Sequence, residues 1–151
     1  MKLQKLISKL EKHHKKKLDL SLGRTFNLLK KLGDPQDKLK NVITVVGTNA
    51  KASMCYSFKS ILNEAGYKTN LYTSPHLLSY TERYVVDDKE INEEDLIELL
   101  TGVEKTLGDD NATLFEILTC AFIKFAENFK DNINIIAVSY THLTLPTKRS
   151  V

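Results

Sequence analysis

The sequence predicts an α/β domain with a mostly parallel sheet flanked by helices, and three observations lead to this prediction. Short apolar or β-branched runs recur along the chain, and segments with helical periodicity separate them. The order strand, helix, strand favours parallel pairing through a crossover helix. The length of 151 residues is enough for one domain with a core and too short for two ordinary ones.

Two helices are expected before the first strand. The opening segment places apolar residues at the i, i+3, i+4, i+7 spacing of an amphipathic helix, at Leu3, Leu6, Ile7 and Leu10. A second helix is expected over residues 21–32, because Gly33 and Pro35 are the usual signals that end a helix. Its expected inward positions are Leu22, Phe26, Leu29 and Leu32.

The run Val42–Val46 is expected to be the first strand. It is apolar on both faces and bounded by Asn41 and Gly47, which suits a central parallel strand buried beneath helices on both sides. A helix that ends at Gly66 is expected next, because apolar residues recur at helical spacing at Met54, Cys55, Phe58, Ile61 and Leu62.

The later elements are read from the same signals. Residues 67–72 are expected to form a strand, residues 74–82 a loop, and residues 83–86 with 90–91 a small hairpin. Asn92 is expected to cap a helix whose buried face carries Leu96, Leu99, Leu100, Val103 and Leu107. A further helix from Thr113 and a buried strand over 133–136 complete the pattern, with expected inward helical positions at Ile117, Leu118, Ala121, Phe122 and Phe125.

The charge balance gives little support for a nucleic-acid partner. Lys and Arg number 22 and Asp and Glu 19, so the formal net charge is only +3. Much of this excess lies in the run KHHKKK at residues 12–17, which is interpreted as a solvated helix end. No interleaved aromatic residues and no recognised RNA or DNA motif accompany the run. No nucleic-acid partner is therefore expected.

The two cysteines, Cys55 and Cys120, are expected to be buried and reduced. Each lies within an apolar helical pattern, and neither belongs to a CxxC pair or lies near an expected ligand histidine. No stretch approaches the roughly 20 apolar residues that a membrane-spanning helix needs. A cytoplasmic protein with no membrane association is expected.

The segment Gly47–Ser53 (GTNAKAS) is the candidate phosphate-binding loop. It lies between the expected strand and the expected helix, where free backbone N–H groups and the helix dipole attract phosphate. Lys51 can contribute a point charge, and the Ser53 hydroxyl can help to hold a phosphate-bound Mg²⁺. Ala50 and Ala52 depart from the usual glycine-rich loop, and Ala is unfavourable wherever φ must be positive. Spacing alone leaves both phosphate binding and an ordinary polar turn open.

The string Gly-Thr-Asn-x-Lys-x-Ser after an apolar strand resembles the phosphate loop of the folylpolyglutamate synthase/dihydrofolate synthase family, within the Mur ligase superfamily. Gly47, Thr48, Asn49, Lys51 and Ser53 match the family pattern, whereas Ala50 and Ala52 replace its glycines. Other strings resemble family segments in family order between residues 17 and 136: DLSLGR at 19–24, LNEAGY at 62–67, LYTSPHL at 71–77 followed by Glu82 and Arg83, and TLFE at 113–116.

The resemblance implies a Mur-ligase-like ATP-binding domain with ATP and Mg²⁺ as cofactors. ATP would be bound by Gly47, Thr48, Asn49, Ala50, Lys51, Ala52 and Ser53. Ser74 would ligate Mg²⁺, although a turn residue before a proline is the alternative. Thr73, Pro75 and His76 would form the family's omega loop, and His76 can equally be an ordinary surface histidine.

Two segments would border the pterin or folate site by resemblance. They are Asp19, Leu20 and Ser21, and Thr113, Leu114, Phe115 and Glu116. Thr113 and Glu116 also have the spacing of a capping box, in which both side chains bind backbone N–H groups at a helix start. A purely structural role for Glu116 is at least as well supported as contact with a ligand.

The implied activity is ATP-dependent ligation of L-glutamate to dihydropteroate or folate through an acyl phosphate, without a covalent enzyme nucleophile. Family members are usually monomeric. Residues 1–137 are expected to be an incomplete N-terminal ATP-binding domain, and residues 138–151 match nothing in the family and resemble a translated adapter remnant. No catalytic residue and no ligase activity are therefore expected of this chain. The alternatives are a non-catalytic or weak nucleotide-binding module and a related Mur-type amino-acid ligase.

Overall fold

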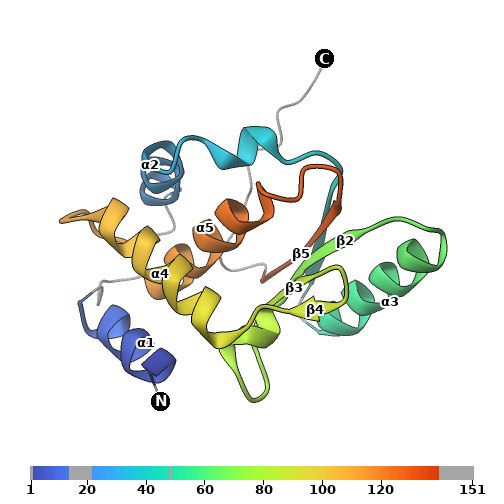
Figure 1. Ribbon diagram of the computed structural model, residues 1–151, viewed down its shortest axis with the longest axis horizontal. Helices are drawn as coiled ribbons and strands as arrows, with labels where there is room; N and C mark the ends of the chain where they lie inside the picture. The colour runs from blue at the N-terminus through green and yellow to red at the C-terminus, as the bar shows by residue number, and fades with distance from the viewer. Residues whose placement is uncertain (1, 14–21, 48, 140–151) are drawn as a thin grey trace.

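The computed structural model describes residues 2–13, 22–47 and 49–139. Within this part of the chain the strands form one sheet in the order β1-β5-β2-β3-β4 (Figure 1). Their bounds are β1 Val42–Gly47, β2 Thr69–Tyr72, β3 Tyr84–Val86, β4 Lys89–Glu90 and β5 Ile133–Ser139.

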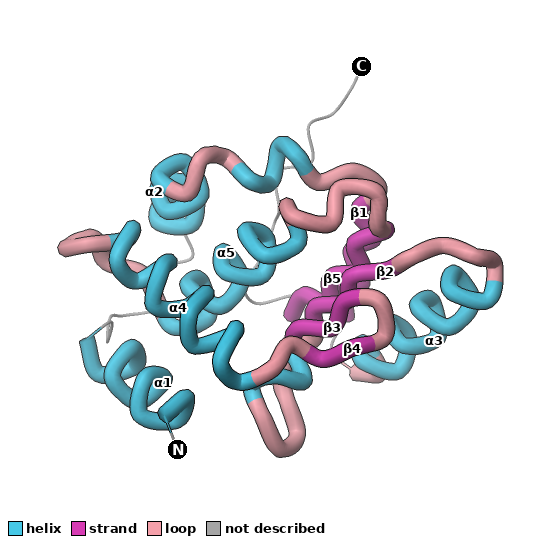
Figure 2. Tube along the Cα trace, in the orientation of Figure 1, coloured by secondary structure: helices cyan, strands magenta, loops and turns pink. Residues whose placement is uncertain are grey.

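Helices cover the two faces of the sheet unequally. Of the described helices, α3 (Lys51–Glu64) is the one on the first face, and α5 (Leu114–Ala126) lies on the other face with α4 (Glu93–Leu107) beside it (Figure 2). Helices α1 (Lys2–His13) and α2 (Gly23–Lys31) pack around α4 and α5, and two short 3-10 helices span Pro35–Lys38 and Tyr80–Arg83. The α/β prediction is confirmed.

The sheet is parallel in one half and antiparallel in the other. Strands β1 and β2 each pair in parallel with β5, which lies between them. The hairpin β3–β4 adds the antiparallel half, because β3 returns directly beside β2. The carboxyl ends of β1 and β2 therefore lie at the same edge of the sheet, where ligands bind in open α/β sheets.

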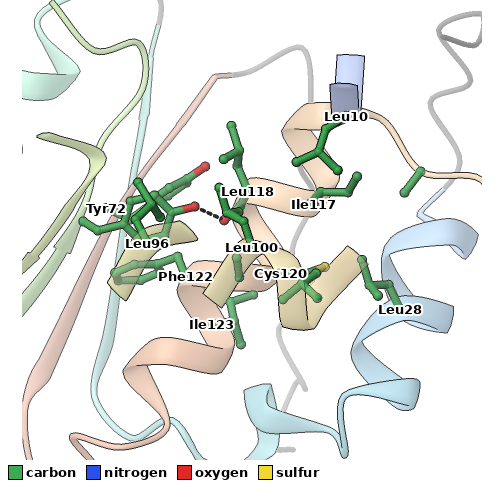
Figure 3. Close-up of a cluster of buried hydrophobic side chains, with 14 of the residues drawn as sticks. Leu10, Leu28, Tyr72, Leu96, Leu100, Ile117, Leu118, Cys120, Phe122 and Ile123 are labelled. Atoms are coloured by element: carbon green, nitrogen blue, oxygen red, sulfur yellow. Dashed lines mark hydrogen bonds between the residues drawn. The ribbon is translucent and has the colours of Figure 1, made fainter. Parts of the chain in front are cut away.

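The main core lies between the sheet and the α4–α5 layer. Tyr72, Tyr84 and Phe122 form an aromatic cluster there, with Tyr72 stacked on Phe122 at a centroid distance of 4.9 Å. The Tyr84 hydroxyl donates to the Leu118 carbonyl at 2.7 Å, so this buried polar group is satisfied. Figure 3 shows α5 side chains packed with Leu96 and Leu100 of α4. A smaller cluster under α3 contains Cys55, Leu71, Val85, Ile135 and Ala137.

The prediction that the first strand is central was wrong. Strand β1 is at the edge of the sheet, and Val42 and Val46 are 44% and 51% exposed. The central parallel strand is β5, whose Ile135 and Ile136 are buried on opposite faces. A run that is apolar on both faces shows only that the strand can be buried on both faces. Whether it is buried depends on the strands and helices that pack beside it.

The inward faces predicted for two helices are only partly correct. Leu29 is buried on α2, but Phe26 is 40% exposed. On α3 only Cys55 is buried and Leu62 half-buried, whereas Met54, Phe58 and Ile61 remain exposed. Helix α3 packs against β1, β5 and β2 with one narrow stripe, so the other apolar positions of its pattern face away from the sheet.

Other local predictions are confirmed. Asn92 caps α4, with its side-chain oxygen accepting from the Asp95 N–H at 2.8 Å. The hairpin turns at Asp87 and Asp88, both of which have positive φ. Strand β5 continues three residues past the predicted Ile136, and Val138 and Ser139 pair with β1. Whether residues 138–151 form a separate tail stays a prediction, because residues 140–151 lie outside the described part.

Both cysteine thiols are buried and unbridged. Burial raises the pKa of Cys55 to about 11 and that of Cys120 to about 12, so neither is a reactive thiolate at neutral pH. Among the described residues, no helix is both long and apolar enough to cross a bilayer. Residues 14–17 of the basic run lie outside the described residues.

Candidate functional site

The candidate phosphate loop joins β1 directly to α3. Ala50 occupies the N-cap position of α3, and its carbonyl accepts the first helical hydrogen bond, from the Met54 N–H at 3.0 Å. Lys51 is the first residue of the helix and directly follows Ala50. The loop therefore connects a strand to a long helix through a turn. The free N–H groups at the start of such a helix are suited to binding anions. Thr48, which the sequence also assigns to this loop, lies outside the described residues.

The Lys51 side chain folds back over the turn. Its Nζ donates to the Gly47 carbonyl at 2.6 Å, so the ammonium lies beside the end of β1. The ammonium is thus held near the N-terminal N–H groups of α3, where positive charge is already concentrated. An arrangement of backbone donors and one ammonium around a turn suits a multiply charged phosphate chain.

The two alanines that replace family glycines have different consequences. Ala50 is in the left-handed region at φ 58°, which costs an L-residue about 1–2 kcal/mol. Ala52 lies in the first turn of α3, where alanine is the most favourable residue. Of these two alanines, only Ala50 therefore strains the loop. Ser53 is exposed two residues after Lys51, where its hydroxyl is accessible to a ligand.

The second part of the site is the loop after β2, residues 73–83, which we call the β2–β3 loop. It contains a cis peptide bond between Ser74 and Pro75 and ends in the 3-10 helix Tyr80–Arg83. Thr73 is buried and continues the pairing with β3, since its N–H donates to the Arg83 carbonyl at 3.3 Å. Pro75 is exposed, while Ser74 and His76 are half-buried.

The Glu82 carboxylate fixes the backbone of the β2–β3 loop. It accepts from the N–H groups of Leu77, Leu78 and Ser79 at 2.8, 2.7 and 2.7 Å. The bonds to the Leu77 and Ser79 N–H groups are the main reason that its pKa is lowered from the usual value. Leu77 and Leu78 themselves are 92% and 95% exposed. A loop with such exposed tips is thus held by hydrogen bonds rather than by apolar packing.

Arg83 anchors the polar side chains of the same loop. It is only 8% exposed, and its Nε donates to His76 Nδ1 at 3.0 Å. Its Nη1 donates to Ser74 Oγ at 3.4 Å, and the guanidinium lies over the Tyr80 ring, 5.0 Å from the centroid. In the sequence, Arg83 was only one residue in a segment that resembles the family. Its burial and its two partners become visible only in the fold.

The segment Thr113–Glu116 forms the predicted capping box at the start of α5. The Thr113 hydroxyl accepts from the Glu116 N–H at 3.2 Å, and the Glu116 carboxylate accepts from the Thr113 N–H at 2.6 Å. Arg24 of α2 also donates to Glu116 at 3.2 Å. The structural interpretation of Glu116 is confirmed, and contact with a ligand stays a prediction. Leu114 and Phe115 are half-buried, and Asp19, Leu20 and Ser21 lie outside the described residues.

The fold brings the phosphate loop and the β2–β3 loop to one edge of the sheet. Strands β1 and β2 are separated only by β5, which corresponds to about 10 Å across the sheet. The register places Tyr72 level with Ile136 and Gly47 level with Ser139. The phosphate loop therefore begins three positions farther along the sheet than the β2–β3 loop. A ligand several ångströms long can contact both.

The residues at this edge suit a nucleotide with its metal ion better than a metal held by protein alone. Among the described residues, no three His, Cys, Asp or Glu side chains gather to hold a metal. The hydroxyls of Ser53 and Ser74 are hard oxygen donors of the kind that Mg²⁺ accepts when phosphates and water complete its shell. The site therefore has the character of an α/β nucleotide-binding domain.

Comparison with known proteins identifies the relatives of this chain. No family model matches it. The dihydrofolate synthase/folylpolyglutamate synthase of Escherichia coli is 36% identical over 132 residues, which cover 87% of this chain and 31% of that protein. The enzyme of the same name from Bacillus subtilis is 35% identical over 116 residues, which cover 72% of this chain and 27% of that protein.

Solved structures agree with these relatives. The structure of E. coli FolC in complex with DHPP and ADP matches 90% of this chain and 33% of its own, with a TM-score of 0.83 and 35% identity. The bifunctional enzyme from Yersinia pestis, complexed with AMPPNP and Mn ion, covers 91% of this chain and 33% of its own, with a TM-score of 0.84 and 30% identity.

The fold and the loop at the end of β1 thus define a Mur-ligase-like α/β nucleotide-binding domain. Within that class, the chain is homologous to the N-terminal part of the dihydrofolate synthase/folylpolyglutamate synthase family. It spans about a third of the length of the curated relatives that it matches.

Proposed function

We propose that Gly47–Ser53 binds the phosphates of ATP and that the protein to which this chain corresponds is an ATP-dependent ligase. The observation that carries the proposal is the position of Lys51, whose ammonium lies over the turn at the N-terminus of α3. Relatives whose structures contain ADP or AMPPNP support the same assignment.

The backbone and side-chain groups of the two loops have distinct roles in this proposal. The N–H groups at the start of α3 donate to phosphate oxygens, and Lys51 exchanges the Gly47 carbonyl for a phosphate oxygen. The hydroxyls of Ser53 and Ser74 are the proposed ligands of Mg²⁺, which neutralises phosphate charge when it is bound. Thr48 and Asn49 complete the loop by resemblance.

The proposed reaction of the whole protein is ligation of L-glutamate to dihydropteroate or folate. The relatives' names and a structure described as containing Mn, AMPPNP and L-glutamate support this assignment. The proposed pterin-site segments are 19–21 and 113–116. Catalysis of this kind requires positioning and charge neutralisation rather than a covalent nucleophile. We propose that the whole protein is a cytoplasmic monomer, and that this chain by itself has no ligase activity.

The test is nucleotide binding by the chain with and without Lys51. Calorimetric titration with AMPPNP and Mg²⁺ should show binding that falls at least about tenfold in Lys51→Ala, because a charge-assisted contact to phosphate is lost. The control is Lys105→Ala, which removes the same charge from the exposed surface of α4. Equal affinity of Lys51→Ala and the control would contradict the proposal.

The strained conformation of Ala50 supports a second candidate function, a weak nucleotide-binding module without catalysis. Strain at the N-cap opposes the backbone geometry that aims N–H groups at phosphate. The two candidates differ in the full-length protein: ADP release that depends on folate and glutamate supports the ligase. Nucleotide binding without such release supports the weak module.

A further inference from the structure

The buried Arg83 guanidinium determines which nitrogen of His76 carries a proton. Arginine has only donors, so His76 Nδ1 must be the acceptor of the 3.0 Å hydrogen bond from Arg83 Nε. An Nδ1 atom that accepts a hydrogen bond has no proton of its own. In a neutral imidazole the proton then resides on Nε2, which becomes a donor.

The side chains around His76 hold its ring in this orientation. Arg83 Nε lies 3.0 Å from Nδ1 of the ring. The ring also lies against Tyr80, with a centroid distance of 4.1 Å. Arg83 is itself buried and lies over the same tyrosine ring, so all three side chains are held together.

The backbone that carries His76 is held as well. Glu82 accepts from the N–H groups of Leu77, Leu78 and Ser79, and the 3-10 helix that follows leads to Arg83. Among the described residues, Arg83 is the only hydrogen-bond partner of the His76 side chain. Because His76 is only half-buried, its Nε2 donor is accessible to solvent or to a bound ligand.

The position of the loop indicates an anionic group. It leaves the carboxyl end of β2, at the same sheet edge as the phosphate loop that follows β1. The buried positive charge of Arg83 adds to the attraction of this edge for anions. A neutral N–H donor that is already oriented loses little entropy when it binds a phosphate oxygen.

We propose that Arg83 is a positioning residue that fixes His76 as the Nε2-protonated tautomer, so that this N–H donates to a phosphate oxygen of the nucleotide. The inference rests on the proposed nucleotide binding at Gly47–Ser53. It assigns Arg83 a role through His76, without direct contact between Arg83 and the ligand. Ser74, which shares the guanidinium at 3.4 Å, is held beside it.

The first test is the tautomer of His76, read from two-bond proton–nitrogen correlation spectra of the uniformly ¹⁵N-labelled chain. The His76→Gln variant assigns the signal. The wild-type spectrum should show a protonated Nε2 and an unprotonated Nδ1, and Arg83→Met should give a mixture of tautomers. A wild-type Nδ1–H would overturn the proposal, as would an unchanged tautomer in Arg83→Met. This measurement needs no nucleotide, so it stands even if the proposed function fails.

The second test is affinity for AMPPNP with Mg²⁺ in the same variants, each checked for folding by circular dichroism. Arg83→Met should weaken binding about three- to tenfold, and Arg83→Lys should restore part of it by donating one hydrogen bond. Should Arg83→Met not fold, the wild-type tautomer and the lysine variant decide the question. Equal affinity in wild type and Arg83→Met would overturn the role in phosphate binding. Absence of binding in the wild type would overturn the proposed function and this role with it, while the tautomer would still decide what Arg83 does to His76.

Discussion

At the scale of single residues, backbone conformation separates two substitutions that look alike in the sequence. Ala50 and Ala52 both replace glycines of the family pattern, and the sequence alone associates a possible cost with each. The structure places a positive φ only at Ala50, while Ala52 is helical. The side chain of residue 50 is therefore a source of local strain, and that of residue 52 is not.

This difference predicts opposite effects of two identical changes. Ala50→Gly should stabilise the chain by about 1 kcal/mol, because glycine adopts positive φ without a steric penalty. Ala52→Gly should destabilise it by up to about 1 kcal/mol, since glycine is a poor helix former. Urea unfolding of both variants measures the difference. Two changes of the same sign would contradict the assigned conformations.

The Glu82 carboxylate predicts a dependence of stability on pH. Its pKa is lowered in the folded chain, chiefly by backbone hydrogen bonds to the Leu77 and Ser79 N–H groups. A lowered pKa contributes stability above the unfolded pKa of about 4.3, and this contribution is lost as pH falls through the folded pKa. Glu82→Gln should therefore lose less stability than the wild type between neutral and acidic pH.

The control for this prediction is Glu98→Gln, a change at an exposed carboxylate of α4. Thermal unfolding from pH 7 to pH 3 gives the comparison. If Glu82→Gln shows the same pH dependence as Glu98→Gln, the carboxylate does not hold the loop in solution.

At the scale of elements, the helix signals in the sequence were reliable where they involved side-chain caps. The Thr113–Glu116 capping box and the Asn92 cap are both present in the structure. Such signals are local, because the capping group and its partners lie within four residues of one another. Burial is not local, and the expected inward positions Phe26, Met54, Phe58 and Ile61 are exposed.

The capping box predicts the effect of its removal. Thr113→Ala should destabilise the chain by about 1 kcal/mol, because the Glu116 N–H loses its acceptor at the start of α5. Thr113→Ser retains the hydroxyl and should recover most of the loss. Urea midpoints of the two variants test this expectation, and equal midpoints would show that the hydroxyl contributes nothing.

At the scale of the whole molecule, the sequence predicted the α/β class and the loop at the end of β1 but not the position of β1. Strand order depends on pairing between distant segments, and nothing within Val42–Val46 specifies its neighbours. For the same reason, the sequence did not predict the side-chain hydrogen bonds that link β2 to the β5 region. Asn70, Asn132 and Asn134 form buried side-chain hydrogen bonds across these strands, including Asn70 to Asn134 at 2.8 Å.

The exposed edge of the sheet predicts self-association of the chain. Val42 and Val46 on β1 are 44% and 51% exposed, and within the described part of the chain β1 pairs with a neighbouring strand on one side only. Val46→Lys should reduce the mass measured by light scattering at high protein concentration. A monomer at all concentrations, in wild type and variant alike, would contradict this prediction.

The central claim is that the turn between β1 and α3 binds the phosphates of a nucleotide. The most direct measurement is the backbone amide spectrum of the ¹⁵N-labelled chain titrated with AMPPNP and Mg²⁺. Shift changes should be largest for residues 49–53, with smaller changes at Ser74 and His76. Changes confined to other surfaces, or none at saturating nucleotide, would contradict the claim.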